Sequence, residues 1–182
     1  MITGSKASRR YASAFLQSAI EQDHLDKVLE DVDLIGNTFV SSPDLKRFVR
    51  NPVIQSSIKR KVLKEIFEPI VEPLSWLFIQ LLIQKGRENL LPEIVKSFVG
   101  LYNLHAGIQV VYLDSAYPVS KDQEKELIAV LEKLTSNRID LKKQVQPGLL
   151  GGMAVRIDDT VIDGTVKNKL SRLRTLFYEA EM

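Results

Sequence analysis

Apolar and polar residues follow two different periods along this chain, and the change of period divides it near residue 106. Before that point, apolar residues recur every three or four positions, which is the spacing of helices that bury one face. Short connections between such stripes are typical of an antiparallel helical bundle. The clearest stripes are Leu25, Val28, Leu29, Val32, Ile35 and Phe39; Ile58, Val62, Leu63, Ile66 and Phe67; and Ile94, Val95, Phe98, Leu101 and Tyr102.

Local signals place the ends of these helices. Ser42 followed by proline is a typical helix start, because the hydroxyl accepts a backbone hydrogen bond and proline fits the first helical position. Asn51-Pro52 ends that short helix, since a residue before proline avoids helical backbone angles. Pro73 opens another helix, and Gly86 is placed to close it. We therefore predict six helices before residue 106.

Residues 107–182 carry strand signals as well as helix signals. Alternating side chains predict one strand around Ile108–Leu113 and a second around Ile139–Val145. Between them, Ser120 and Gln123 have the spacing of a capping box, which starts a helix. The predicted fold class is α+β: a six-helix all-α bundle in residues 1–106, followed by a smaller α/β domain in residues 107–182.

The C-terminal segment has the most specific pattern. Met153–Ile157 alternates as a strand, Asp158–Thr160 is a turn signal, and Val161-Ile162 starts the strand back. Asp163–Thr165 then offers a helix N-cap. The helix after it interleaves apolar and basic residues, and no catalytic side chain stands at any junction. Its apolar residues are Val166, Leu170, Leu173 and Phe177, and its basic residues are Lys167, Lys169, Arg172 and Arg174.

Leu150–Leu173 resembles the C-terminal signature of the delta subunit of F-type ATP synthases, the family that includes the mitochondrial oligomycin-sensitivity-conferring protein. The resemblance continues along the chain, where Gly86–Phe98 and Ala116–Ser120 match two further family patterns. Asp158 stands where the family usually has glycine, but aspartate tolerates turn conformations, so the predicted fold is unchanged. The N-terminal pattern of the family is matched by Arg9, Tyr11, Ala12 and Ala14.

This resemblance implies a non-catalytic stator subunit, present in a single copy. Residues 1–106 would bind the alpha and beta subunits of the catalytic head, and residues 107–182 would bind the b subunits of the peripheral stalk. Such a subunit resists rotor torque during proton-driven ATP synthesis by remaining bound. The resemblance also implies a peripheral protein, with no direct membrane insertion and no cofactor or metal. Its family pattern is shared by bacterial and organellar versions; the start of the chain leads us to expect the cytoplasmic face of the bacterial inner membrane.

Two predicted helices carry more apolar surface than one core needs. The first helix is apolar on two adjacent sides, and the helix from Leu74 is apolar nearly all round. Such a helix is either central in its bundle or covered by another polypeptide, and periodicity leaves both interpretations open. The resemblance implies a groove between the first and fifth helices that takes the N-terminal helix of an alpha subunit. Mapped onto this chain, the groove is lined by Ala7, Tyr11, Ala14, Phe15, Trp76, Leu77, Ile79 and Ile83.

For the stalk contact, the resemblance points to the last helix. The alternative is that the apolar residues of this helix pack on the adjacent sheet of their own chain and make no stalk contact. The groove contact and the stalk contact must each depend mainly on apolar burial. Nanomolar affinity corresponds to a binding free energy of about −12 kcal/mol, whereas an exposed ion pair contributes only about 0–1 kcal/mol. The predicted stalk-binding residues are Val166, Leu170, Arg172, Leu173 and Arg174.

Composition changes this picture little. The chain has 182 residues, of which 45% are apolar and 26% charged, as in ordinary globular proteins. The absence of cysteine excludes disulfides and cysteine-ligated metal. The longest apolar run, Leu74–Ile83, is about half of what a bilayer requires. The basic start of the chain superficially resembles a transit peptide, but we interpret it as the first helix of the bundle, which favours a bacterial protein.

A nucleic-acid-binding adaptor is the alternative function. Lys59–Lys61 with Lys64, and the basic last helix, provide cations for phosphates. The net charge of +2 is weak, however, and acids follow the lysines, so we interpret them as a solvated surface and predict no nucleic-acid partner. We predict no enzyme either, because His24 and His105 have no metal-type partner and no nucleophile or phosphate-loop motif occurs.

Overall fold

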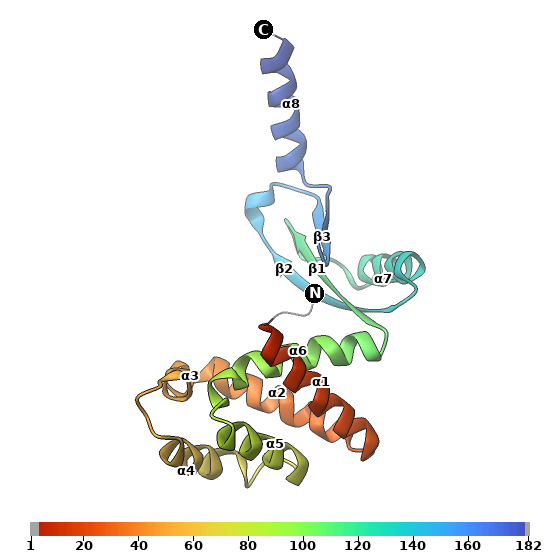
Figure 1. The fold of residues 1–182 in the computed structure, drawn as a ribbon. Helices are drawn as coiled ribbons and strands as arrows, with labels where there is room; N and C mark the ends of the chain where they lie inside the picture. Colours follow the sequence, from red (N-terminus) through yellow and green to blue (C-terminus); the bar gives the residue numbers. More distant parts are fainter. Residues whose placement is uncertain (1–3, 181–182) are drawn as a thin grey trace. The chain divides into compact units, whose positions relative to one another are not determined.

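A computed structural model describes residues 4–180, and Figure 1 shows their helices and strands. The chain forms two compact units, one extending through Tyr102 and the other beginning at Asn103. The predicted division at residue 106 marks the end of the last helix of the bundle, whereas the boundary between the units lies within that helix. The difference arises because the final turn of the helix, with an exposed Leu104, packs little against the bundle.

In its described part, from residue 4 onward, the helical unit contains the predicted six α-helices and one short 3-10 helix. Ser42 accepts a hydrogen bond from the N–H of Leu45, Asn51 ends the short third helix, and Gly86 follows the fifth helix with a φ of +63°. These are the boundaries that the local signals predict. The elements are α1 (Lys6–Glu21), α2 (Leu25–Ser41), α3 (Pro43–Arg50), α4 (Ser56–Phe67), α5 (Pro73–Gln84), η1 (Glu88–Leu90) and α6 (Leu91–His105).

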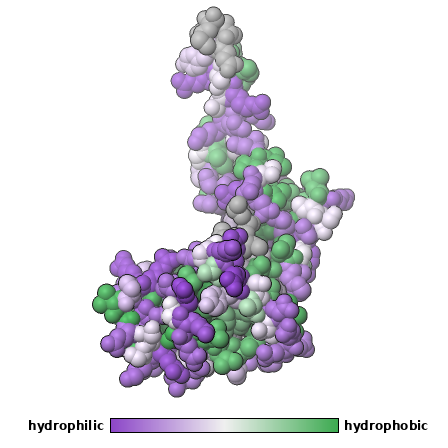
Figure 2. Space-filling model, in the orientation of Figure 1, coloured by the Kyte–Doolittle hydropathy of each residue, from purple (hydrophilic) through white to green (hydrophobic). Residues whose placement is uncertain are grey.

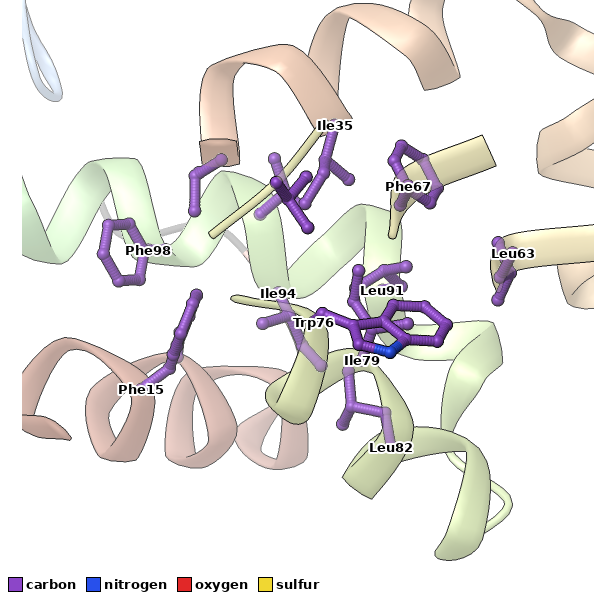
Figure 3. Close-up of a cluster of buried hydrophobic side chains, with 14 of the residues drawn as sticks. Phe15, Ile35, Leu63, Phe67, Trp76, Ile79, Leu82, Leu91, Ile94 and Phe98 are labelled. Atoms are coloured by element: carbon purple, nitrogen blue, oxygen red, sulfur yellow. The ribbon is translucent and has the colours of Figure 1, made fainter. Parts of the chain in front are cut away.

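Aromatic rings at the centre of this unit join four helices. Figure 3 shows Phe15 of α1 directed toward Phe98 of α6, and the two ring centroids are 5.2 Å apart. Phe39 of α2 and Phe67 of α4 make a second ring contact, with centroids 6.2 Å apart. Trp76 of α5 lies in the same core. Because the rings are buried and packed against each other, the helical unit has a single well-filled interior.

In the residues that the structure describes, the second unit is a small four-stranded sheet with two α-helices and one short 3-10 helix. β1 (Ile108–Ser115) and β2 (Arg138–Val145) pair in parallel and are connected through α7 (Lys121–Thr135). β3 (Met153–Ile157) pairs antiparallel with both β1 and β4 (Thr160–Asp163), so the strand order is β2-β1-β3-β4. The capping box of Ser120 and Gln123 is formed in both directions. The short helix η2 (Pro147–Leu149) and the last helix, α8 (Val166–Ala180), complete the unit.

The core of this second unit is much smaller than that of the helical unit. It is centred on Val111 and Leu113 of β1, Leu131 of α7 and Val155 of β3, whereas β4 is exposed throughout. At the β3–β4 turn, Asp158 has a φ of +47°. Aspartate tolerates this left-handed conformation better than most residues, so the turn forms with aspartate where the family usually has glycine.

The interpretation of Lys59 as part of a solvated surface is wrong. Its side chain points inward, and its ammonium Nζ lies 2.9 Å from the carboxylate Oε1 of Glu88. Lys59 is 3% exposed and Glu88 is 5% exposed. The reason is the register of α4, because residues 59, 63 and 67 share one helical face and the other two are the buried Leu63 and Phe67.

Candidate docking surfaces

Helix α5 has an inner face in the core and an outer face that its own chain leaves partly open. On the outer side, Leu77 is 61% exposed and Leu81 is 42% exposed, and Leu74 and Phe78 are half-buried. These four residues follow the spacing i, i+3, i+4, i+7, so they form one continuous apolar stripe. The first sequence interpretation, a helix central in its bundle, therefore holds for the inner face only. The outer stripe is left open, and its covering by another polypeptide stays a prediction. The inner face consists of Ser75, Trp76, Ile79, Leu82 and Ile83.

Helix α1 lies beside this stripe. The rings of Phe15 and Phe78 stack in parallel, with centroids 4.1 Å apart and an angle of 3° between their planes. Next to Phe15 on α1, Ala7 and Ala14 are exposed and Tyr11 is half-buried. Figure 2 shows apolar surface, in green, between the positions of α1 and α5 in Figure 1. We call this surface the α1–α5 strip, and it comprises Ala7, Tyr11, Ala14, Leu74, Leu77, Phe78 and Leu81.

The structure separates the eight residues predicted for the alpha-subunit groove into two sets. Ala7, Tyr11, Ala14 and Leu77 lie on the strip and are accessible without any movement of the core. Leu74, Phe78 and Leu81 also lie on the strip and were not predicted, because a helix that is apolar nearly all round does not show in its sequence which side faces outward. The other four predicted residues are buried in the core of the chain itself: Phe15, Trp76, Ile79 and Ile83.

Helix α8 presents a second apolar face. Val166, Leu170 and Leu173 are 40%, 53% and 51% exposed, and Phe177 is 70% exposed. The alternative in which the leucines pack on the sheet is therefore wrong. In Figure 1, α8 continues beyond the strands, and no other labelled element of its unit lies alongside it. The predicted Arg172 and Arg174 are also exposed, and an open depression runs over Leu170, Leu173, Arg174, Phe177 and Tyr178.

Backbone contacts fix the first turn of α8 to the loop that precedes β3. The N–H of Val166 donates to the carbonyl oxygen of Gly151 at 2.9 Å. Thr165 Oγ1 accepts from the N–H of Asn168, which is the side-chain cap that the sequence predicts. The N–H of Thr165 donates to Asp163 Oδ1 at 2.9 Å, and this backbone hydrogen bond lowers the pKa of the Asp163 carboxyl.

Other kinds of site have little support in the described residues. Among residues 4–180, no group of three or more histidine, cysteine, aspartate or glutamate side chains is placed to hold a metal ion. In the same range, no helix is both long and apolar enough to cross a bilayer. The basic patch proposed for phosphates is also interrupted, because Lys59 is buried against Glu88 and Lys64 lies 3.5 Å from Glu68.

Comparison with known proteins agrees with this architecture. The chain matches the family model described as ATP synthase delta (OSCP) subunit over residues 7–177. ATP synthase subunit delta of Chlorobaculum tepidum is 37% identical over 168 residues, which cover 92% of this chain and 93% of that one. The subunit delta of Symbiobacterium thermophilum is 35% identical over 174 residues, covering 96% and 94% of the two chains.

A solved structure has the same fold. A chain in the mitochondrial ATP synthase hexamer of Toxoplasma gondii superposes with a TM-score of 0.71 at 24% identity, over 96% of this chain and 98% of that one. The family match and the two bacterial relatives each extend across both units of the chain. The chain therefore belongs to the ATP synthase delta (OSCP) subunit family, whose members are components of the peripheral stalk rather than catalytic subunits.

Proposed function

We propose that this chain links the catalytic head of a bacterial ATP synthase to its stalk through two apolar faces. The α1–α5 strip takes the N-terminal helix of an alpha subunit, and α8 takes the b subunits. The observation that carries the proposal is the outer stripe of α5, where Leu77 and Leu81 stay exposed on a helix whose other face forms the core. An amphipathic helix is the partner that fits such a surface.

The size of the strip limits how tightly it binds by itself. Burying a leucine or phenylalanine side chain completely stabilises a complex by about 1.5–3 kcal/mol, and the four α5 residues are already partly covered. About 1–2 kcal/mol each, or about 4–8 kcal/mol in all, remains before the costs of association. The α5 residues of the strip therefore fall short, by themselves, of the roughly −12 kcal/mol of nanomolar binding.

Linking two contacts in one chain makes up for this limit. When one face is bound, the other rebinds as an intramolecular event at a high effective concentration, so the chain stays in place through a brief release at either face. That property suits a single-copy stator, which performs no chemistry and has only to remain bound while the rotor turns. On this proposal the chain is peripheral and lies at the cytoplasmic face of the bacterial inner membrane.

The head contact is tested with a labelled synthetic peptide of the alpha-subunit N-terminus, titrated against the full chain by fluorescence anisotropy. Leu77→Glu and Leu81→Glu are each expected to weaken binding at least about tenfold, because a charge would enter an apolar contact. Val40→Glu is the control, since Val40 is an exposed apolar residue on α2, outside the strip. Circular dichroism checks that each variant is folded. Equal affinities for all three variants would refute the head contact.

The stalk contact is tested separately with a soluble C-terminal segment of the b subunits. Leu170→Glu and Leu173→Glu on α8 are expected to abolish co-sedimentation of this segment with the full chain. Leu134→Glu on α7, at an exposed leucine of the same unit, should leave it unchanged. If the α8 variants retain the b segment as well as the control does, the stalk contact lies elsewhere and this part of the proposal fails.

A further inference from the structure

The apolar residues of α8 have the spacing of a coiled-coil seam. Val166, Leu170, Leu173 and Phe177 are separated by alternating steps of four and three, as positions d, a, d and a of two heptads. At about 100° per residue, the four side chains lie within about 60° of the helix circumference. All four are exposed, so the rest of the described chain leaves this seam uncovered.

The charges beside the seam have one sign. In the same heptad register, Lys167 and Arg174 occupy e positions on one side, and Lys169 occupies a g position on the other. The second g position is the exposed Leu176, which widens the apolar face there. The sequence of α8 contains no acidic residue before position 179. The seam is thus flanked by cations without any acidic neighbour on its own helix.

We propose that α8 docks on a partner helix whose apolar seam is flanked by acidic side chains at its own e and g positions. This inference rests on the proposed stalk contact and names the chemistry that the partner must have. Opposite charges at e and g select partners in coiled coils, whereas like charges oppose pairing. A second copy of α8 would face Lys167, Lys169 and Arg174 with the same cations, so the charges disfavour self-association.

The width of the apolar face on α8 favours a partner helix over a membrane surface as the binding partner. Helices that lie in a bilayer interface bury a broad apolar face among the lipid chains. On α8 the a and d residues cover only about 60°, and Lys167 and Lys169 border them on both sides before Leu176 widens the face at one g position. This is the narrower geometry of a helix–helix seam. Arg172 is among the stalk-binding residues predicted from the sequence, but it lies about 130° from the middle of this stripe, on the far side of α8. The proposed seam therefore leaves Arg172 outside the contact, and this makes it the control for the flanking cations.

The length of α8 sets a further requirement on the partner. Fifteen residues span about 22 Å, and an isolated helix of that length is only marginally stable in water. Two short helices would not hold each other in place, so the partner helix must already be formed in a longer assembly. The hydrogen bond from Val166 to Gly151 fixes the first turn of α8 and thereby the point at which the partner is met.

The experiment uses the full chain and three synthetic heptad peptides with identical leucine seams. Their e and g positions are all glutamate, all glutamine or all lysine. In about 0.01 M salt, the glutamate peptide should bind at least about tenfold more tightly than the glutamine peptide, and the lysine peptide most weakly. The differences should shrink in about 1 M salt, where the Debye length falls from about 30 Å to about 3 Å.

Charge reversal on α8 provides the matched variants. The triple variant Lys167→Glu, Lys169→Glu and Arg174→Glu should invert the order of the three peptides, whereas Arg172→Glu should preserve it. Equal binding of the three peptides, or a triple variant that still prefers glutamate, would overturn the inference. Tighter seam-dependent binding to phosphatidylglycerol vesicles than to the glutamate peptide would also overturn it, as would dimerisation through α8 in analytical ultracentrifugation.

The b-subunit segment distinguishes failure of this inference from failure of the proposed function. If Leu170→Glu abolishes binding of the segment and the triple variant leaves it unchanged, the stalk contact stands and the acidic flanks are refuted. If the unaltered chain does not bind the segment, the stalk contact itself fails. Loss of segment binding in both the Leu170 variant and the triple variant, but not in Arg172→Glu, is the result that we expect.

Discussion

Replacing Lys59 with methionine would leave the carboxylate of Glu88 in the core of the helical unit without its cation. The pair connects α4 to η1 across a separation of 29 residues, with 2.9 Å between Nζ and Oε1. The second carboxylate oxygen, Oε2, is buried and has no hydrogen-bond partner among the described residues. The lysine is therefore the main compensation for a charge that is shielded from water.

The expected loss of stability is about 3–5 kcal/mol. Removing one partner of a buried ion pair typically costs that much, because the other charge stays desolvated. The double variant Lys59→Met with Glu88→Met removes both charges and keeps similar volumes. It should lie within about 1 kcal/mol of the unaltered chain.

Urea unfolding followed by Trp76 fluorescence measures how much the free energy of unfolding of the helical unit changes in each variant. Trp76 is the only tryptophan of the chain, and it is buried in the core of the helical unit. Lys64→Met is the control, because Lys64 pairs with Glu68 on the same helix in an exposed i,i+4 contact worth less than about 1 kcal/mol. The reasoning is refuted if Lys59→Met costs no more than Lys64→Met, or if the double variant is as unstable as the single one.

Three further predictions concern the second unit, and thermal unfolding monitored by circular dichroism checks the first two. Ser120→Ala removes the capping box of α7 and should cost about 1 kcal/mol. Gly152→Ala should cost more, about 1–3 kcal/mol, because φ is +76° and the new Cβ would lie 2.5 Å from a backbone carbonyl oxygen. The hydrogen bond from the Thr165 N–H lowers the pKa of the Asp163 carboxyl from 3.8 because it favours the ionised form. This contact therefore stabilises the folded chain fully above pH 3.8, and the stabilisation is lost as the pH falls below that value. NMR amide shifts at the start of α8 should report that loss, and they should not change in Asp163→Asn.

Most of the fold could be predicted from the sequence because each element carries its own signal. An amphipathic helix such as α2 shows its buried face in the spacing of its apolar residues, and caps such as Ser42 mark its start. The side of α5 that faces outward is different, because the helix is apolar nearly all round. There, the stack of Phe15 on Phe78 and the burial of Ser75 turn Leu77 toward solvent. Those contacts depend on another helix, so no pattern within α5 encodes them.

Lys59 illustrates the same limit for a charged residue. Its position on α4 matches the face of Leu63 and Phe67, but a lysine in a basic run is typical of an exposed surface. Only the carboxylate of Glu88, placed by a different element, makes that buried position tolerable. Whether Lys59 is buried thus depends on Glu88 as well as on Lys59 itself. A sequence pattern that considers each residue alone therefore places Lys59 on the exposed side of the helix.

The two units expose apolar surface in different ways, and the difference bears on how a stator behaves. On α5 the exposed stripe is the back of a helix whose front is anchored in a large core, so that surface is formed before any partner arrives. Among the side chains of α8 that the structure describes, residues 166–178, no hydrophobic one is buried, so the unit contributes little packing energy to keep the helix formed. Docking on α8 must therefore include the cost of ordering the helix, which weakens that contact for a given buried area. If the chain functions as proposed, the head contact is the preformed one, and the stalk contact is the one that assembly of the complex completes.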